Sequence, residues 1–255
     1  MGTQILNKDV SVISNVMVTP KANIGSVGGI TGWGIVTDNL LINLDAANTQ
    51  SYPGSGTTWN DLSGNGRNGT LVNSPAFTSD GGGCIVLDGV NDYISMSTLG
   101  VAPSNLTVDY WIKRNADNGY FWVIDNMDQP ELRMRFEGGN LAPAIFDNGA
   151  YILETVSSTT FSTSLWYNIC VTITNGSQKI YINGGTEIIT GTGTYDGAVS
   201  GDNAGEHTLG TYNRPGDGYG GYASVKIGSY RFYNRVLTLQ EVTQNYNATK
   251  VRFGL

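Results

Sequence analysis

The twenty residues Trp166–Gly185, WYNICVTITNGSQKIYINGG, decide the fold, because they predict two neighbouring antiparallel strands. Apolar and polar residues alternate on both sides of Asn175-Gly176, and a period of two places successive side chains on opposite faces of a strand. Asn-Gly between two such runs is the strongest short hairpin signal, because both turn residues must reach positive φ. The stretch therefore indicates an all-β chain.

Similar alternation extends over most of the sequence after residue 39. The clearest runs are 105–114 (NLTVDYWIKR) and 131–137 (ELRMRFE). We expect each strand to bury one face. The second run carries charged residues that we expect to form a solvated face with mutual ion pairs: Glu131, Arg133, Arg135 and Glu137. Roughly a dozen such strands predict an antiparallel two-sheet sandwich.

One short helix is predicted in the C-terminal region, beginning at Thr238, which can cap it. Thr238 and Glu241 form the capping box TLQE, in which each side chain bonds the backbone of the other residue. Leu237 and Val242 flank the cap as a hydrophobic staple, and Leu239, Val242 and Tyr246 share one helical face. Because the helix is short, packing against the sheets must stabilise it.

Composition excludes several classes of partner. Charged residues make up 14% of the 255 residues, and the net charge is −7. The chain therefore lacks the basic footprint that nucleic acid or an anionic membrane would require. It contains no run of 18 apolar residues and no signal peptide, so we expect neither a membrane span nor export by general secretion.

The first 38 residues differ from the remainder. Residues 10–20 (VSVISNVMVTP) are β-prone and nearly uncharged, and residues 23–34 (NIGSVGGITGWG) are rich in glycine. We predict an extended N-terminal arm, residues 1–35, for docking or oligomerisation, followed by one domain, residues 36–255. An exposed strand-forming segment offers unpaired backbone groups to another chain. The alternatives are a mobile terminus and a strand that closes its own domain.

The two cysteines, Cys84 and Cys170, each lie in an apolar, β-branched run. Free Cys is among the most buried residue types, so we interpret both as buried thiols. A disulfide between them stays open, because sequence alone does not show whether their Cα atoms lie within about 7 Å.

A family resemblance rests on seven segments: Ile35–Leu71, Ile85–Met96, Leu106–Arg114, Leu165–Ile173, Lys179–Gly185, His207–Pro215 and Ile227–Ala248. In this order they resemble the laminin-G-like, concanavalin A-like jelly-roll domains of phage virion proteins and bacterial surface proteins. The opening segment and the tail 245–255 (NYNATKVRFGL) resemble structural proteins of marine and cyanobacterial phages in particular.

The resemblance implies a non-enzymatic role on the virion surface, as capsid decoration, fibre or adsorption component. Members vary widely in ligand, so the resemblance does not imply which ligand is bound. We expect synthesis in the host cytoplasm, virion proteins as partners through the arm, and cell-surface glycan as a ligand. We expect a homo-oligomer, with a trimer as a guess. The alternatives are a calcium-dependent, carbohydrate-binding adhesin of a bacterial surface and a glycan hydrolase on a lectin-like sandwich.

The segment 84–96, CIVLDGVNDYISM, permits two interpretations. Asp88, Asn91 and Asp92 supply the oxygen ligands that Ca²⁺ prefers, and some relatives hold calcium at loops on the sandwich rim. The same residue types tolerate left-handed backbone and bond to their own turn. We favour the hairpin over the calcium site, because further ligands would have to come from distant segments.

Aromatic residues in two stretches are candidates for glycan binding. Sugars stack their apolar faces on aromatic rings, and fixed polar groups set their orientation. The first stretch is NGYFWVID and the second is a Gly-rich loop, TYNRPGDGYGGYAS. The candidate ligand-binding residues are Tyr120, Trp122, Tyr212, Arg214, Asp217, Tyr219 and Tyr222. Trp59 and Trp166 are expected in the core.

The sequence gives little indication of a catalytic site. His207 is the only histidine, so a nucleophile would have no other imidazole base, and we expect His207 to be a packed or solvent-facing side chain. A glycoside hydrolase needs two paired carboxyl groups. Asp125, Asp128 and Glu131 have a spacing of three, and Pro130 interrupts them. We therefore expect no enzymatic activity.

Overall fold

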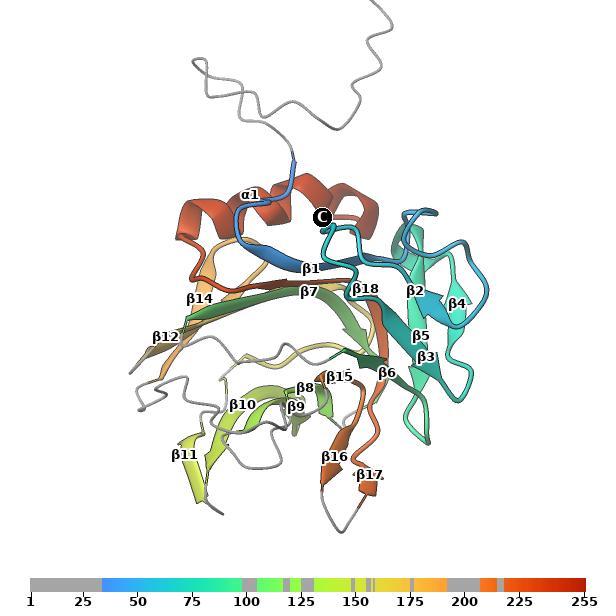
Figure 1. Cartoon of the computed structure of the whole chain (residues 1–255). Helices are drawn as coiled ribbons and strands as arrows, with labels where there is room; N and C mark the ends of the chain where they lie inside the picture. Colours follow the sequence, from blue (N-terminus) through green and yellow to red (C-terminus); the bar gives the residue numbers. More distant parts are fainter. Residues whose placement is uncertain are drawn as a thin grey trace, which may run out of the picture. The chain divides into compact units, whose positions relative to one another are not determined.

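Antiparallel pairing organises the described residues into two eight-stranded sheets and one small hairpin (Figure 1). The computed structural model describes residues 34–97, 105–116, 120–124, 131–147, 150–154, 157, 159–174, 177–191, 207–214 and 218–255. Sheet A has the order β14 (Thr186–Gly191), β13 (Ser177–Ile182), β12 (Tyr167–Thr174), β7 (Leu106–Arg114), β18 (Ser224–Tyr233), β5 (Cys84–Asp88) and β4 (Ala76–Thr78), and β1 (Leu40–Asp45) also pairs with β18.

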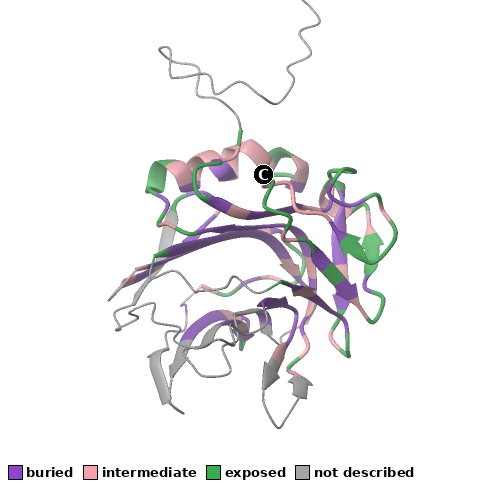
Figure 2. Ribbon diagram, viewed as in Figure 1, coloured by how far each residue is buried: buried purple, intermediate pink, exposed green. Residues whose placement is uncertain are grey.

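Sheet B faces sheet A across the core. Its order is β11 (Ala150–Glu154), β10 (Asn140–Asp147), β9 (Glu131–Glu137), β8 (Tyr120–Ile124), β15 (His207–Leu209), β6 (Tyr93–Met96), β3 (Gly69–Val72) and β2 (Thr58–Trp59). The hairpin pairs β16 (Tyr212–Arg214) with β17 (Gly218–Gly220). One cluster of buried residues joins the two sheets, including Ile85 and Val108 from sheet A and Ile94 and Met134 from sheet B. Figure 2 shows the buried residues following the strands of sheet A. This arrangement confirms the predicted antiparallel sandwich.

The hairpin that the sequence indicates most strongly is present. β12 ends at Thr174, β13 begins at Ser177, and these two residues pair across the strands. Two residues therefore connect the strands, which is the loop length that the Asn-Gly signal predicts.

The outward face of β7 is buried as well, which corrects the expectation that each strand buries one face. Thr107, Asp109 and Trp111 have exposed fractions of 0%, 1% and 0%. The helix α1 (Leu239–Thr249) and the 3₁₀ turn η2 (Lys250–Phe253) contact this face: the Trp111 ring stacks on Phe253 with centroids 4.0 Å apart. The C-terminal segment thus gives sheet A a second apolar layer.

The predicted helix start is confirmed in detail. The Thr238 side chain accepts the Glu241 N–H, and the Glu241 side chain accepts the Thr238 N–H. Leu237 and Val242 are both 1% exposed and pack in one cluster, as a staple requires. Leu239, in contrast, is 52% exposed, so its predicted place on the buried face is wrong. Asn245 is buried instead.

The charged run of β9 also departs from expectation. Met134 and Phe136 face the core as predicted, and Arg135 bonds Glu137 at 2.8 Å. Arg133, however, is 1% exposed, so it does not belong to a solvated face. The residues paired with this strand on β10, Ala142 and Ala144, are buried too, which shows that the outward side of this part of sheet B is covered.

Strand β1 pairs, among the described strands, with β18 alone, and a loop covers its other side. The Asn43 N–H donates to Asp61 Oδ1 at 2.8 Å, and Ser63 Oγ donates to the Leu41 carbonyl at 3.0 Å. The Leu62 N–H donates to the Asn43 carbonyl at 2.8 Å. The loop therefore uses the backbone groups that a further strand would otherwise pair with.

Both cysteines are free and fully buried, and Trp59 and Trp166 are buried as expected. Among the described elements, no helix has the length and apolar character needed to cross a membrane. Residues 1–33 lie outside the described part of the chain, so the N-terminal arm and the domain boundary at residue 36 stay predictions.

Candidate functional site

The connection between β5 and β6 is a turn organised by Asp88. Its Oδ1 accepts the N–H groups of Val90, Asn91 and Asp92 at 2.8, 3.2 and 3.3 Å. Gly89 has a φ of +80°, a conformation that glycine adopts without strain. These hydrogen bonds, the one from Val90 foremost, hold the pKa of Asp88 below its usual range. The knot of polar residues in CIVLDGVNDYISM therefore builds the turn.

The same residues fit a calcium ion poorly. Calcium takes six to eight oxygen ligands, whereas Asp88 Oδ1 already accepts three N–H groups. Asp92 is 6% exposed, and burial together with the charge of Asp88 raises its pKa. Within the described ranges no three His, Cys, Asp or Glu residues cluster in a way that suits a metal. The calcium site at Asp88, Asn91 and Asp92 stays a prediction that this donor set does not support.

The Gly-rich loop forms the hairpin β16–β17. Tyr212 pairs with Gly220, and the Thr211 hydroxyl donates to the Gly220 carbonyl at 2.7 Å. A Cβ atom at Gly220 would lie 2.9 Å from Tyr212 Oη, so the tyrosine ring lies against the glycine backbone. Of the other predicted residues, Arg214 and Tyr219 are placed by their strands, and Asp217 lies outside the described residues.

Tyr222 follows this hairpin and contacts Tyr93, the first residue of β6. Their ring centroids are 6.4 Å apart with the planes at 41°. The next residue, Ala223, donates its N–H to the Gly210 carbonyl at 2.9 Å, which fixes the backbone beside Tyr222. Burial and the neighbouring Tyr93 raise the pKa of Tyr222. The tyrosine pair thus joins the β16–β17 hairpin to the β5–β6 turn.

This juxtaposition defines a rim made of Asp88–Asp92, Tyr93, Tyr212 and Tyr222. Asp88, Asn91 and Asp92 were predicted as a turn or a calcium site, and Tyr212 and Tyr222 as part of a glycan site, whereas Tyr93 was predicted for neither. The sequence feature that could have identified Tyr93 was its position directly after Asp92 in the segment 84–96. Strand β8, with Tyr120 and Trp122, lies next to β16, which brings the other predicted aromatic stretch beside the rim.

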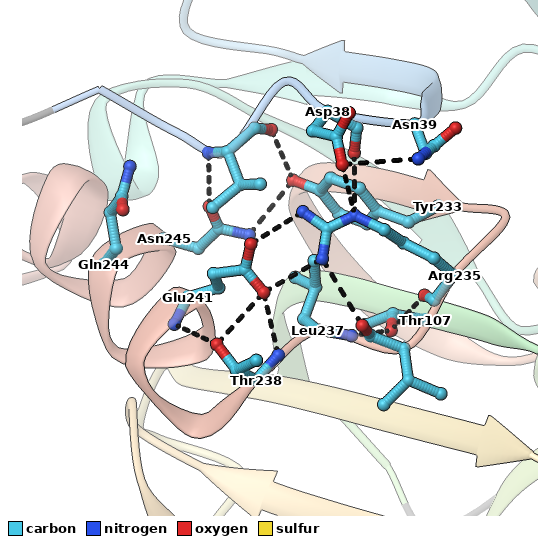
Figure 3. A network of polar contacts seen from close by, with 12 residues as sticks. Asp38, Asn39, Thr107, Tyr233, Arg235, Leu237, Thr238, Glu241, Gln244 and Asn245 are labelled. Atoms are coloured by element: carbon cyan, nitrogen blue, oxygen red, sulfur yellow. Dashed lines mark hydrogen bonds and ion pairs between the residues drawn. The ribbon is translucent and has the colours of Figure 1, made fainter. Parts of the chain in front are cut away.

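A second polar cluster lies between α1 and sheet A (Figure 3). Arg235 binds both carboxylate oxygens of Glu241, at 2.9 and 2.7 Å, and its Nε lies 3.0 Å from Asp38 Oδ2. The hydrogen bond from Arg235 lowers the pKa of Glu241 to about 2. A carboxyl group that stays ionised in this way cannot donate a proton at neutral pH, so Glu241 is not suited to act as a general acid. We interpret this cluster of Arg235, Glu241 and Asp38 as a clamp that holds the helix in place.

The clamp extends to the first described residues of the chain. Asn245 Oδ1 accepts the Val36 N–H at 2.8 Å, and Tyr233 donates its hydroxyl to the Val36 carbonyl at 3.0 Å. Deeper in sheet A, Asp109 and Arg231 form an ion pair of 3.2 Å with both side chains 1% exposed. Asn168 and Asn245 add hydrogen bonds to the Asp109 carboxylate at 2.6 and 3.0 Å. These bonds satisfy a buried charge and hold α1 in place.

His207 does not form part of a surface site. Its side chain is fully buried, and Nε2 lies 2.6 Å from the hydroxyl of Tyr230. The expectation of a packed histidine is confirmed. Of the carboxyl groups considered for hydrolysis, Asp125 and Asp128 lie outside the described residues, and Glu131 is placed only as the first residue of β9.

Comparison with known proteins identifies the domain type. The family model described as "Concanavalin A-like lectin/glucanases superfamily" matches residues 88–243. No curated protein matches the sequence.

Several solved structures share the fold. Domain 4 of AbnA, an extracellular arabinanase from Geobacillus stearothermophilus, in complex with arabinotriose, is 19% identical with a TM-score of 0.62, covering 82% of this chain and 98% of that one. The receptor-binding domain of botulinum neurotoxin C/D mosaic serotype is 15% identical with a TM-score of 0.59, covering 83% and 51%. Trypanosoma rangeli sialidase in complex with sialic acid is 10% identical with a TM-score of 0.58, covering 86% and 34%. At these identities the likeness concerns the fold.

Proposed function

Because the chain belongs to the Concanavalin A-like lectin/glucanases superfamily, we propose that it is a non-enzymatic, carbohydrate-binding protein of a phage virion surface. The arabinanase domain supports the binding part, since this sandwich corresponds to nearly the whole of a domain complexed with a trisaccharide. The observation that carries the proposal is the tyrosine pair on the rim, Tyr222 on Tyr93, between two loops. Function on such sandwiches resides in sites on the loops rather than in the fold itself.

The rim provides the two elements that sugar recognition needs. The Tyr222 ring offers an apolar surface for the face of a sugar ring, and Tyr93 and the Ala223 backbone hold that ring in place. The polar turn at Asp88–Asp92 lies beside Tyr93 and can orient hydroxyl groups. We therefore expect the rim to bind without rearrangement, which would reduce the entropic cost of binding.

Glycan titration tests this site. We expect wild-type protein to bind members of a glycan panel, and Tyr222→Ala to weaken that binding about tenfold, because the stacked ring contributes about 1 kcal/mol or more. Tyr222→Phe, which keeps the ring, should retain most of the affinity. Val251→Ser is the control, since Val251 is 80% exposed in the C-terminal 3₁₀ turn and lies outside the rim. A panel that stays blank, with and without calcium, contradicts the proposal.

Placement on a virion rests on the resemblance of the opening segment and the tail to phage structural proteins. The predicted arm, residues 1–35, would attach the domain to other virion proteins, and many copies on one particle would raise the avidity of a weak site by factors on the order of 10²–10⁴. Mass spectrometry of purified particles should find the protein at many copies per particle. Undiminished incorporation of a variant lacking residues 1–35 would remove the docking role of the arm.

The proposal of a non-enzymatic protein is tested by assaying the release of reducing ends from host polysaccharides. We expect no turnover. If turnover occurs and disappears in Asp128→Asn or Glu131→Gln, the protein is a glycoside hydrolase and the binding proposal is wrong.

A further inference from the structure

We infer that the rim selects neutral glycans and disfavours anionic ones, an inference that rests on the proposed function. An exposed carboxyl group lies beside the tyrosine pair, because Asp88 pairs across the strands with Ser224, two residues after Tyr222. A ligand stacked on Tyr222 therefore lies close to Asp88.

Asp88 carries a full negative charge at neutral pH. It is exposed, and it accepts hydrogen bonds from three neutral backbone N–H groups, which favour the carboxylate and leave its charge in place. These bonds hold its pKa below the usual range. Four cations of the described residues pair with carboxylates outside the rim: Lys113 and Lys226 with Asp80, Arg252 with Asp45, and Arg235 with Asp38 and Glu241.

The physical consequence depends on the ligand. A uronate, sialate or sulfate group bound at the tyrosine pair would lie within a Debye length, about 8–10 Å, of the Asp88 carboxylate and would be repelled. A neutral sugar has hydroxyl groups that can donate hydrogen bonds to that carboxylate. At solvent-exposed positions this difference corresponds to about three- to tenfold in affinity. The overall net charge of −7 acts in the same direction.

The test uses the full chain and matched pairs of oligosaccharides that differ only in charge, such as oligogalacturonate and its methyl ester, together with neutral and sulfated forms of other glycans. We expect the members that bind to be neutral, with at least threefold weaker binding of the charged counterpart at low salt and a smaller difference at 0.3 M salt. Equal or stronger binding of the charged members overturns the inference and leaves the proposed function standing. Absence of binding to every member overturns both.

Asp88→Asn identifies the side chain responsible. Asparagine keeps an Oδ1 acceptor for the three turn N–H groups, so the turn is retained. We expect the variant to bind the charged member about threefold more tightly and the neutral member within twofold of wild type. Asp38→Asn is the matched control, because it changes the net charge equally at a side chain that is 75% exposed beside α1. An equal gain in both variants shows that net charge, not the rim, sets the preference, and overturns the inference.

Discussion

At the scale of single residues, His207 shows how the core determines a protonation state. The imidazole lies between the sheets, 2.6 Å from the Tyr230 hydroxyl and edge-on to the Phe232 ring. Burial, with a smaller contribution from the charge of Arg67, lowers its pKa from 6.5 to about 3. The unfolded chain therefore binds a proton on His207 between these two pH values, and the folded protein does not.

A pH dependence of stability follows from this difference. Above pH 6.5 the histidine is neutral in both the folded and the unfolded chain, so it does not affect stability. As the pH falls from 6.5 towards 3, only the unfolded chain takes up the proton, and the folded protein loses stability. We expect the free energy of unfolding to fall by about 2 kcal/mol between pH 7 and pH 5. Denaturant titrations at both pH values measure it.

His207→Gln removes this titration and serves as the control. Its stability should show no loss between pH 7 and pH 5, because the lowered pKa values of Asp88 and Glu241 act mainly below pH 4.5 and the raised pKa of Asp92 adds stability as the pH falls. An equally steep loss in the variant would show that another group causes the pH dependence.

At the scale of elements, the C-terminal segment acts as a cover for sheet A. Phe253 lies between Trp111, with centroids 4.0 Å apart, and Trp166, at 4.9 Å. Its ring is so close to the backbone that a Cβ atom at Gly228 would lie 2.7 Å from it. Arg252 completes the attachment with a hydrogen bond to the Gly228 carbonyl at 2.9 Å. One aromatic side chain thus connects the last turn to two tryptophans.

Phe253→Ala should destabilise the protein by about 3 kcal/mol, because it leaves a cavity between two tryptophans that are buried in the folded state. Val251→Ala is the control, since Val251 is 80% exposed, and its effect should stay within about 0.5 kcal/mol. Thermal and denaturant unfolding of the full chain measure both. A loss below 1 kcal/mol for Phe253→Ala would show that the segment does not stabilise sheet A.

Sequence reasoning predicted the elements that local patterns determine. The hairpin between Thr174 and Ser177 and the capping box at Thr238 depend on residues close together in the chain. The second buried face of β7 does not, because it results from Trp111 meeting Phe253, 142 positions later. Arg133 escaped prediction for the same reason: alternation gives the two faces of a strand but not what covers them.

At the scale of the whole molecule, the site was predictable in its parts and not in its assembly. The turn at Asp88 and the loop tyrosines are visible in the sequence, since turn-forming and aromatic residues have characteristic types. Their meeting at Tyr93 and Tyr222 depends on how two sheets are stacked, which no short stretch encodes. The sandwich class was predictable, because alternation repeats along the entire domain.

The reactivity of the two thiols shows whether the whole sandwich is folded. Cys84 packs with Trp111 and Trp166, and Cys170 packs in a different cluster with Tyr233 and Val242. Both are fully buried, and burial raises the pKa of each thiol. Neither is therefore accessible as a thiolate while the protein is folded.

We expect no reaction with a thiol reagent in native protein and reaction of both thiols after unfolding in denaturant. The melting temperature should be the same with and without reductant, because the cysteines are free. Rapid labelling of one thiol under native conditions would reveal local opening of its cluster, and a reductant-dependent melting temperature would contradict the free-thiol assignment.

The loop that hydrogen-bonds to the outer side of β1 affects how neighbouring copies of the domain can interact. With Asp61 and Ser63 already joined to that strand, an approaching molecule meets side chains there instead of vacant amide and carbonyl groups. Neighbouring copies at high density therefore do not pair along this edge to form a continuous intermolecular sheet.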